Sequence, residues 1–384
     1  MSTLNSEING QQDRLWLIRA LDIIFLSIAL VSLTYAVITA PRNGIDFLTY
    51  HKGASEWIEG AYSDGAGALF TYPPFTIPLI SPVALISFER ARILWLGLNL
   101  AAAAISIYLV LRYFKGWPPR AKFYLALALL SLAPFRVTLR VGQISLIITA
   151  LLLGAILARA RNRKYLAGAL LGISLCKFTL SFPFFLYFLW KKEWKMLAAA
   201  IALMTVLTYL YALRLGVSLV KVAGDYLTVM SRLPASTSGP FTGSTEIKPL
   251  LIWMTGGDNV WSSVALIALV ASSLIVMALA FARRPGDEQH HFAIISLFAL
   301  WTLYHRTYDS VLYVIPIALL IDFLARGEHK RFSRFWLAAT GLLVFSIPGL
   351  LTSRLGIDEA RLSGSAPGLL GLHLERILTL GMFA

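Results

Sequence analysis

Long apolar runs, separated by clusters of basic residues, constrain this sequence more than any other feature. Runs such as residues 23–40, 93–111 and 260–282 approach the roughly 20 residues that an α-helix needs to cross a bilayer. Of the 384 residues, 58% are hydrophobic and only 14% are charged, about half the charged share of an ordinary soluble domain. We therefore predict an all-α polytopic membrane protein, which excludes a soluble enzyme, a disulfide-rich secreted module and a disordered chain.

The chain carries a formal net charge of +14. In a polytopic protein such an excess belongs to cytoplasmic loops, and no nucleic-acid-binding motif accompanies it, so we expect membrane lipids and no nucleic acid as partners. The single cysteine, Cys176, lies in an apolar run and allows neither an internal disulfide nor a cysteine-based metal cluster. The sequence also lacks a phosphate-binding loop and a dinucleotide fingerprint, so we expect no cofactor.

Basic clusters in the loops predict the direction in which each run crosses the membrane. Arg14 and Arg19 place residues 1–22 in the cytoplasm, whereas residues 41–68 hold more acidic than basic side chains and form an external loop. Further basic clusters follow the runs at residues 93–111, 144–157, 260–282 and 311–324. Each of these runs is therefore expected to end in the cytoplasm.

Residues 23–352 are expected to form a single transmembrane domain of about 9–13 helices, given the length that a span requires. A second external loop is expected at residues 216–248, with an amphipathic piece inside it. Residues 353–384 are predicted to form an amphipathic tail that lies along the membrane surface.

Two apolar segments are predicted to be interrupted. Residues 69–88 contain four prolines, which remove backbone donors, so a broken or re-entrant segment is favoured over a regular span. Residues 165–190 have basic clusters at both ends and an interruption near Lys177 and Pro183. Two short half-helices that enter the membrane and return would place both basic clusters on the cytoplasmic side.

Asp46 is the candidate catalytic residue, because it follows the first apolar run at the expected outer surface of the membrane. A carboxylate that is partly shielded from water there can accept a proton near neutral pH. The alternative interpretation is that Asp46 only meets water or caps the next helix.

Cationic and amide side chains are predicted to face the same outer side. Arg140 and Gln143 lie between two adjacent apolar runs, and Lys177 is the clearest ionisable residue inside a run. Ionisable groups at membrane depth are expensive and usually face a cavity or a partner. The alternative for Lys177 is that its side chain extends to the membrane interface.

The polar patch at residues 304–309 lies between two runs on the outer side. His305 and Arg306 supply donors suited to a phosphate, whereas Asp309 has the simpler alternative of pairing with Arg306. The topology, assigned from basic loops alone, therefore places a carboxylate, several cations and several aromatic side chains toward one face.

This arrangement suits a transferase that works outside the cytoplasm. Sugar nucleotides are not available there, so the donor must be carried by lipid, as in a polyprenyl-phosphate sugar. Its phosphate leaving group requires Lys, Arg or His, while one carboxylate deprotonates an acceptor hydroxyl on a lipid or glycan, and one base suffices for inversion. The metal-binding Asp-x-Asp pattern is absent from the chain, so no metal is expected. Trp57, Tyr62 and Tyr72 would stack against a sugar.

Four sequence elements, taken in order, resemble a known family. They are Asp46-Phe47-x-x-Tyr50, Tyr72-Pro73-Pro74, Gly142-Gln143 and Ala167-Gly168-x-x-x-Gly172-x-x-x-x-Lys177. Their order and spacing are similar to those of glycosyltransferase family 87, the polyprenol-phosphate-mannose-dependent mannosyltransferases of the GT-C superfamily. The resemblance covers residues 23–196.

The resemblance implies a multi-span GT-C-like fold with juxtamembrane helices in the first external loop, and a catalytic aspartate carried by Asp46. It also implies that His305 matches a family histidine near the donor phosphate. The expected substrate-binding residues are Tyr50, Tyr72, Arg140, Gln143, Lys177, His305 and Arg306. The expected location is a bacterial inner membrane, with the site facing the periplasm or exterior.

Two other classes of protein remain as alternatives. A transporter or flippase of lipid-linked sugars would also need cations at membrane depth, but it needs a central site with access from both sides. A noncatalytic scaffold of envelope assembly would have no reason to bring Asp46, Lys177 and His305 together. The distances between these three side chains therefore distinguish an enzyme from a scaffold.

Overall fold

The computed structural model describes residues 2–61, 71–237 and 247–328, and all regular structure in these ranges is helical. The predicted tail at residues 353–384 lies outside the described residues. Six described helical segments are long and apolar enough to span a membrane by length and composition, and a seventh results if a bent helix pair is counted as one. The protein is therefore an all-α, multi-pass membrane protein, which confirms the predicted fold class.

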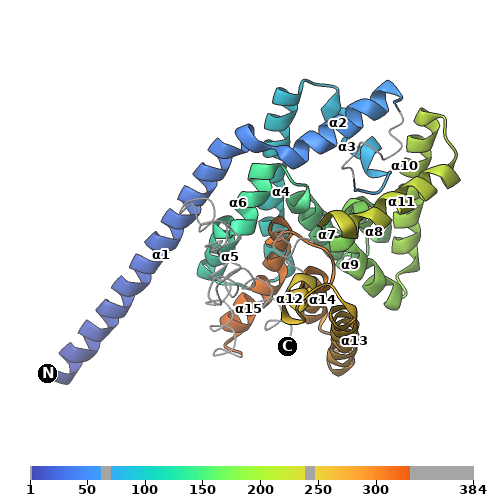
Figure 1. The fold of residues 1–384 in the computed structure, drawn as a ribbon. Helices are drawn as coiled ribbons and strands as arrows, with labels where there is room; N and C mark the ends of the chain where they lie inside the picture. The colour runs from blue at the N-terminus through green and yellow to red at the C-terminus, as the bar shows by residue number, and fades with distance from the viewer. Residues whose placement is uncertain (1, 62–70, 238–246, 329–384) are drawn as a thin grey trace.

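The helices follow one another without strands in the described ranges (Figure 1). They are α1 (Ser2–Asn43), α2 (Ile45–Glu59), α3 (Thr76–Ala84), α4 (Phe88–Tyr113), α5 (Pro119–Ser131), α6 (Ala133–Val141), α7 (Ser145–Ala160), α8 (Lys164–Ser174), η1 (Leu175–Lys177), α9 (Phe178–Trp190), α10 (Trp194–Leu215), α11 (Leu219–Thr237), α12 (Lys248–Met254), α13 (Val260–Arg283), α14 (Glu288–Thr302), η2 (Thr307–Tyr313) and α15 (Val314–Arg326).

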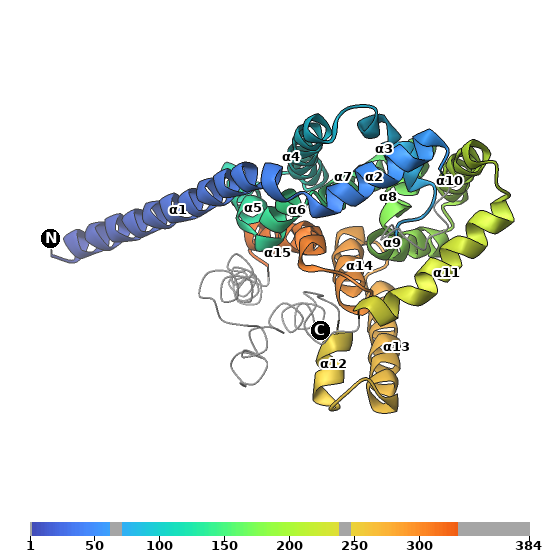
Figure 2. The same cartoon turned by 45° about the horizontal axis from the view of Figure 1, so that its top comes forward.

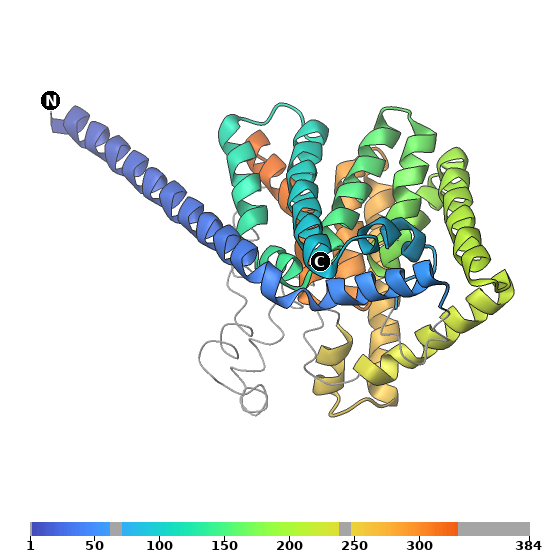
Figure 3. The same cartoon turned by 90° about the horizontal axis from the view of Figure 1, so that it is seen from above.

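Helix α1 projects away from the rest of the molecule toward the N-terminus, and its later part packs against α5 and α6 (Figure 1). The chain turns at Gly44, whose φ of +24° disfavours residues with a Cβ. Helix α2 then runs across one end of α4 and α7, roughly perpendicular to them (Figure 3). It is a juxtamembrane helix of the kind predicted for residues 41–68, and it carries Asp46.

Proline residues account for the two irregular segments before α7. Pro134 has no N–H, and its ring would clash with the preceding turn of a continuous helix, so α5 and α6 are separate and bent by 50°. In the described part of residues 69–88, the nine-residue helix α3 contains Pro82 and is too short to span. The structure thus has the broken form that the prolines predicted.

Residues Lys164–Trp190 have the length and hydropathy of a single span, but they fold as a hairpin. The backbone leaves helical geometry at Lys177, with φ −109° and ψ 79°. Glu193, just beyond α9, pairs with Lys164 at the start of α8 at 2.6 Å. Both ends of the segment therefore lie on the same side, as the two basic flanks predicted, and η1 forms the tip.

The bundle has two chemically distinct ends. At one end, Arg159 of α7 pairs with Glu193 at 2.7 Å and with Glu288 of α14 at 2.8 Å. We call this the Arg159 end. The opposite end contains the beginning of α7, helix α2 and the tip of the α8–α9 hairpin, and we call it the Asp46 end.

Small residues allow α8 and α10 to pack closely. A Cβ on Gly168 would lie 2.2 Å from the carbonyl oxygen of Met196, and one on Gly172 would lie 2.9 Å from that of Ala200. The matching register shows that α8 and α10 run parallel from the Arg159 end. The Gly168-x-x-x-Gly172 element is therefore a helix-packing motif that positions the hairpin carrying Lys177.

The later helices flank this bundle. Helix α11 forms the amphipathic piece predicted within residues 216–248, and α12 and α13 lie side by side beyond it (Figure 2). Asn259 caps α13 by accepting hydrogen bonds from the backbone of Trp261 and Ser262. Much of α13 is apolar and exposed, as expected for a helix that faces lipid.

Candidate active site

Two sequence elements that lie far apart in the chain meet at the Asp46 end. Gly142 has φ +72°, and a Cβ there would lie 2.6 Å from the Cβ of Phe47. The carbonyl oxygen of Gly142 accepts a hydrogen bond from the indole of Trp95 at 2.8 Å, and Trp95 stacks on Phe47 at 5.2 Å between ring centroids. This packing holds Gln143 beside the first turn of α2.

Gln143 links Asp46 to a buried hydrogen-bond network. Its Oε1 accepts from the hydroxyls of Tyr50 and Tyr72 and from the backbone N–H of Ile144, the last two at 2.7 and 2.8 Å. Its Nε2 donates to Oδ2 of Asp46 at 3.1 Å. Since only the amide oxygen can accept from these donors, the network fixes which way the amide points.

Asp46 is partly buried in the first turn of α2. Burial raises the pKa of this carboxyl above its usual range, although Lys177 and Arg306 act in the opposite direction by attracting the charged form. A carboxyl group in this state accepts a proton more readily than an exposed aspartate. The surroundings of Asp46 therefore favour the protonated form of its carboxyl more than water does.

Lys177, at the tip of the hairpin, makes an ion pair inside the protein. Its ammonium lies 2.5 Å from Oδ1 of Asp309 and donates to Oγ of Ser145 at 3.0 Å, and its residue is 7% exposed. The ring of Tyr308 lies 4.5 Å from the ammonium. The side chain therefore does not extend to the membrane interface, which was the alternative considered from the sequence.

His305 and Arg306 approach the same region from the connection between α14 and η2. His305 is fully buried, and its Nδ1 lies 3.1 Å from Oδ2 of Asp309. The Arg306 side chain is exposed and donates to the hydroxyl of Tyr304 at 2.9 Å. The alternative that Asp309 merely pairs with the Arg306 guanidinium is wrong, because Asp309 bonds Lys177 and His305 instead.

The predicted site residues thus occupy different positions within one region. Asp46, Gln143, Tyr50 and Tyr72 form one hydrogen-bonded group, and Lys177 and His305 form a second group around Asp309. Gln143 of the first group and Ser145 of the second are only two residues apart in the chain, so the two groups lie next to each other.

Other predicted residues lie at the edge of this region. The backbone carbonyl of Arg140 accepts a hydrogen bond from the N–H of Gly44 at 3.0 Å, and Arg140 is partly exposed. Among the aromatic residues expected to stack on sugar, Trp57 is partly buried and donates to the carbonyl of Tyr211 at 3.2 Å. Tyr62 lies outside the described residues.

Two residues of the site were missed or underestimated from the sequence. Ser145 donates to Oδ1 of Asp309 at 2.5 Å, but a serine at the start of an apolar run carries no recognisable signal. Asp309 was placed in the correct patch, but the partner considered for it was wrong. Asp309 follows His305 by four residues, but His305 precedes η2 and Arg306 is extended, so helical spacing gave no signal for their contact.

Chemically, the site combines one carboxylate with a raised pKa and a neighbouring set of cations. The first can accept a proton, and the second can stabilise an anionic group. Among the described residues, no cluster of His, Cys, Asp and Glu has the geometry of a metal site.

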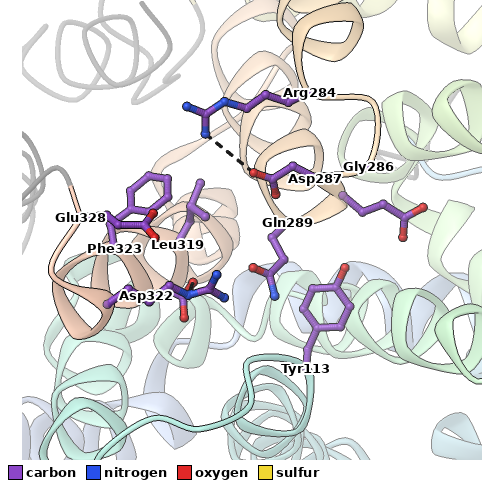
Figure 4. Close-up of a pocket in the computed structure, with 11 residues that line it drawn as sticks. Tyr113, Arg284, Gly286, Asp287, Gln289, Leu319, Asp322, Phe323 and Glu328 are labelled. Atoms are coloured by element: carbon purple, nitrogen blue, oxygen red, sulfur yellow. Dashed lines mark ion pairs between the residues drawn. The ribbon is translucent and has the colours of Figure 1, made fainter.

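A separate cavity of about 530 Å³ lies at the Arg159 end, between α4, α14 and α15 (Figure 4). Its lining includes Tyr113, Gln289 and Glu328, together with Arg284 and Asp287, whose ion pair measures 3.8 Å. None of the predicted site residues lines this cavity. It is at the opposite end of the bundle from Asp46.

Comparison with known proteins connects this geometry to a family. The model of glycosyltransferase family 87 matches residues 70–304. A polyprenol-phosphate-mannose-dependent alpha-(1-2)-phosphatidylinositol mannoside mannosyltransferase of Mycobacterium tuberculosis is 25% identical over 317 residues, which cover 75% of this chain and 71% of that protein. A protein of the same description from Mycolicibacterium smegmatis is 27% identical over 173 residues, 39% of each chain. No solved structure gives a significant match.

Proposed function

The chain belongs to glycosyltransferase family 87, and on this premise we propose that it transfers a hexose from a polyprenyl-phosphate donor to a lipid or glycan acceptor. The donor sugar is proposed to be mannose, and the acceptor a lipid-anchored glycan, because the relatives are named for such substrates. One observation carries this proposal: Asp46, Gln143, Lys177 and His305 converge at one end of the bundle from four separate elements.

Asp46 acts as the general base of the transfer. The acceptor hydroxyl gives its proton to a carboxylate oxygen of Asp46, while the acceptor oxygen forms a bond to the anomeric carbon. The bond between that carbon and the phosphate oxygen breaks, and its electron pair stays on the phosphate. A single displacement of this kind inverts the anomeric centre and requires one base.

The leaving polyprenyl phosphate gains negative charge as this bond breaks. Lys177 and Arg306 carry positive charge beside Asp46, and His305 lies in the same cluster. Lys177 and His305 are buried, whereas Arg306 is exposed. Fixed donors that are shielded from water stabilise developing charge without reorganising at the moment of reaction. These three side chains are therefore proposed to hold the donor phosphate.

The proposed orientation follows from the charge of the loops. Basic residues gather at the Arg159 end, where Lys164 shares Glu193 with Arg159 and Arg284 lines the same cavity as Glu288, and such clusters face the cytoplasm. The Asp46 end then faces the periplasm or exterior of a bacterial inner membrane. A donor carried by lipid is required on that side, because sugar nucleotides stay in the cytoplasm.

The direct test is transfer by the purified protein in vesicles that contain radiolabelled mannosyl-phosphoryl-polyprenol and phosphatidylinositol mannosides. We expect a new radiolabelled glycolipid from the wild type and a loss of at least about 100-fold for Asp46→Asn, since a general base contributes this much or more. Asp225→Asn, which alters a partly exposed aspartate on α11, is the matched control and should retain full transfer.

The outcomes separate the alternatives. Near-normal turnover by Asp46→Asn would remove Asp46 from the mechanism. Movement of intact donor across the bilayer, with no new glycoside formed, would identify a flippase and overturn the proposal. Unaltered donor affinity in both Lys177→Ala and His305→Ala would reassign the phosphate site.

A further inference from the structure

Asp309 is the second carboxylate of the site, and four donors surround it. Oδ1 lies 2.5 Å from the ammonium of Lys177 and accepts from the hydroxyl of Ser145 at 2.5 Å. Oδ2 lies 3.1 Å from Nδ1 of His305 and 3.4 Å from the backbone N–H of Arg306. Asp309 itself is 2% exposed, so these contacts replace water around the carboxylate.

This geometry determines the tautomer of His305. An ionised carboxylate can only accept hydrogen bonds, so the Nδ1 of His305 that faces Oδ2 must carry a proton. In the neutral ring, Nε2 is then the basic nitrogen. The same bond holds the orientation of the ring, as a carboxylate behind a functional histidine does in other enzymes.

Asp309 also fixes the position of the Lys177 ammonium group. A buried ammonium group is costly unless an anion and hydrogen bonds compensate for the lost water. Asp309 and Ser145 provide both for Lys177, and the Tyr308 ring covers a further side. The cation is therefore held on the side of Asp309, at the tip of the α8–α9 hairpin.

Other charged or titratable groups face this cluster from neighbouring elements. Asp46 approaches from α2 and Arg306 from the same connection as His305, while Tyr72 and Tyr308 contribute phenol groups. The two carboxylates of the region nevertheless have different partners. Asp309 is shared by Lys177 and His305, whereas Asp46 is bonded to Gln143.

We propose that Asp309 is a positioning residue at the site of the donor phosphate. Asp309 holds Lys177 in place and keeps His305 in its Nδ1–H form. Nε2 of His305 is then the nitrogen that exchanges a proton with the phosphate. The inference rests on the proposed function for its catalytic meaning. Its structural content, the tautomer of His305, is measurable without any transfer reaction.

The Asp309→Asn variant tests the tautomer directly. Lys177 can only donate, so the new amide should turn its oxygen toward Lys177 and its NH₂ toward His305. The Nδ1 of His305 must then accept, and the proton of the neutral ring moves to Nε2. Nitrogen-15 NMR of histidine-labelled protein in lipid distinguishes the two forms, and the spectrum of His305→Gln identifies the His305 signals among those of the six histidines.

Kinetics supply a second measurement. In Asp309→Asn, kcat/KM for the donor should fall about 100-fold, as when an aligned donor to a developing anion is lost, while KM for the acceptor stays unchanged. Asp309→Glu keeps a carboxylate and should recover part of the activity. Asp322→Asn is the matched control, because Asp322 is also 2% exposed but bonds Trp117 and Arg326 at the Arg159 end.

The proposal is overturned if His305 keeps its Nδ1–H form in Asp309→Asn, or if this variant weakens donor and acceptor equally. If Asp309→Asn does not fold, the NMR and kinetic measurements are made on Asp309→Glu. Because this variant keeps a carboxylate, the proposal requires that His305 keeps its Nδ1–H form and that kcat/KM for the donor changes more than KM for the acceptor. Absence of transfer by the wild type would refute the proposed function, but the tautomer measurement would still test the role of Asp309.

Discussion

Nε2 of Gln143 donates a hydrogen bond to Oδ2 of Asp46 at 3.1 Å, and the hydrogen bonds on its Oε1 determine that orientation. Gln143 was predicted from the sequence to bind substrate. In the structure it is 1% exposed and connects the carboxylate of Asp46 to the hydroxyls of Tyr50 and Tyr72. We therefore expect Gln143 to act by orienting the carboxylate of Asp46.

Replacing Gln143 with Leu should lower kcat more than it raises KM for either substrate. The substitution removes the donor to Asp46, so the carboxylate loses its orientation, and a loss of about 10- to 100-fold is expected for a residue of this kind. Tyr50→Phe is the milder comparison, because it removes one donor to Gln143 and leaves the bond to Asp46. Equal effects of the two variants, measured by steady-state transfer, would contradict this role.

Arg306 should influence the pH dependence of transfer. Burial raises the pKa of Asp46, and the positive charge of Arg306 opposes that rise. The base is active only when ionised, so activity falls as the pH drops through this pKa. Arg306→Gln should move the acidic limb of kcat/KM to higher pH, whereas Arg112→Gln, in the last turn of α4, should leave it in place. A shift toward lower pH would show that the sign is wrong.

Asp46 should reduce the stability of the folded protein at neutral pH. Because the pKa of Asp46 is raised on folding, its protonated form stabilises the folded state relative to the ionised form. This contribution to the free energy of unfolding is lost as the pH rises through the folded pKa. Asp46→Asn should therefore unfold at a higher temperature than the wild type at pH 8, with the difference shrinking toward about pH 4. Glu59→Gln, an exposed change on the same helix, is the control. A lower unfolding temperature for Asp46→Asn at pH 8 would contradict the prediction.

Gly142 should tolerate no side chain. A Cβ would lie 2.6 Å from the Cβ of Phe47 and would also meet a φ of +72°, so Gly142→Ala must displace α2 or Gln143. We expect lower thermal stability and a loss of transfer. In the middle of α4, a Cβ added to Gly97 would meet no atom within 4 Å, so Gly97→Ala should be neutral or stabilising by about 0.5–1 kcal/mol. Thermal unfolding in detergent compares the two.

Glu193 should stabilise the Arg159 end. Burial alone would raise its pKa, but hydrogen bonds from Lys164 and Arg159 outweigh this and lower it. Glu193→Gln should cost about 2 kcal/mol of unfolding free energy, the scale of a lost charge-assisted hydrogen bond. The stabilisation by Glu193 exists above its unfolded pKa and is lost as the pH falls through the folded value. Asp225→Asn, in an exposed pair with Lys221, should change stability little; a similar loss in both variants would contradict the prediction.

The helical segments were largely predictable because hydropathy and loop charge are properties of short stretches of sequence, although the described residues contain six or seven candidate spans where about 9–13 helices were expected for the whole domain. The apolar runs and prolines indicated the spans and the broken helix α3, and the basic flanks of residues 165–190 indicated that this segment returns to the side from which it starts. The glycines of the Gly168-x-x-x-Gly172 element were recognisable as a motif. Their contact with α10 was not, since it depends on a helix that begins after the hairpin.

The candidate residues could also be selected from the sequence, but the hydrogen bonds among them could not. Asp46, Gln143, Lys177 and His305 were recognisable because charged and amide groups are unusual beside apolar runs. The hydrogen bond from Gln143 to Asp46 joins residues 97 positions apart, and the bond from Ser145 to Asp309 joins residues 164 apart. Such contacts form only after helices have packed. The tertiary structure therefore decided that Asp309 bonds both Lys177 and His305, and that Asp46 bonds Gln143.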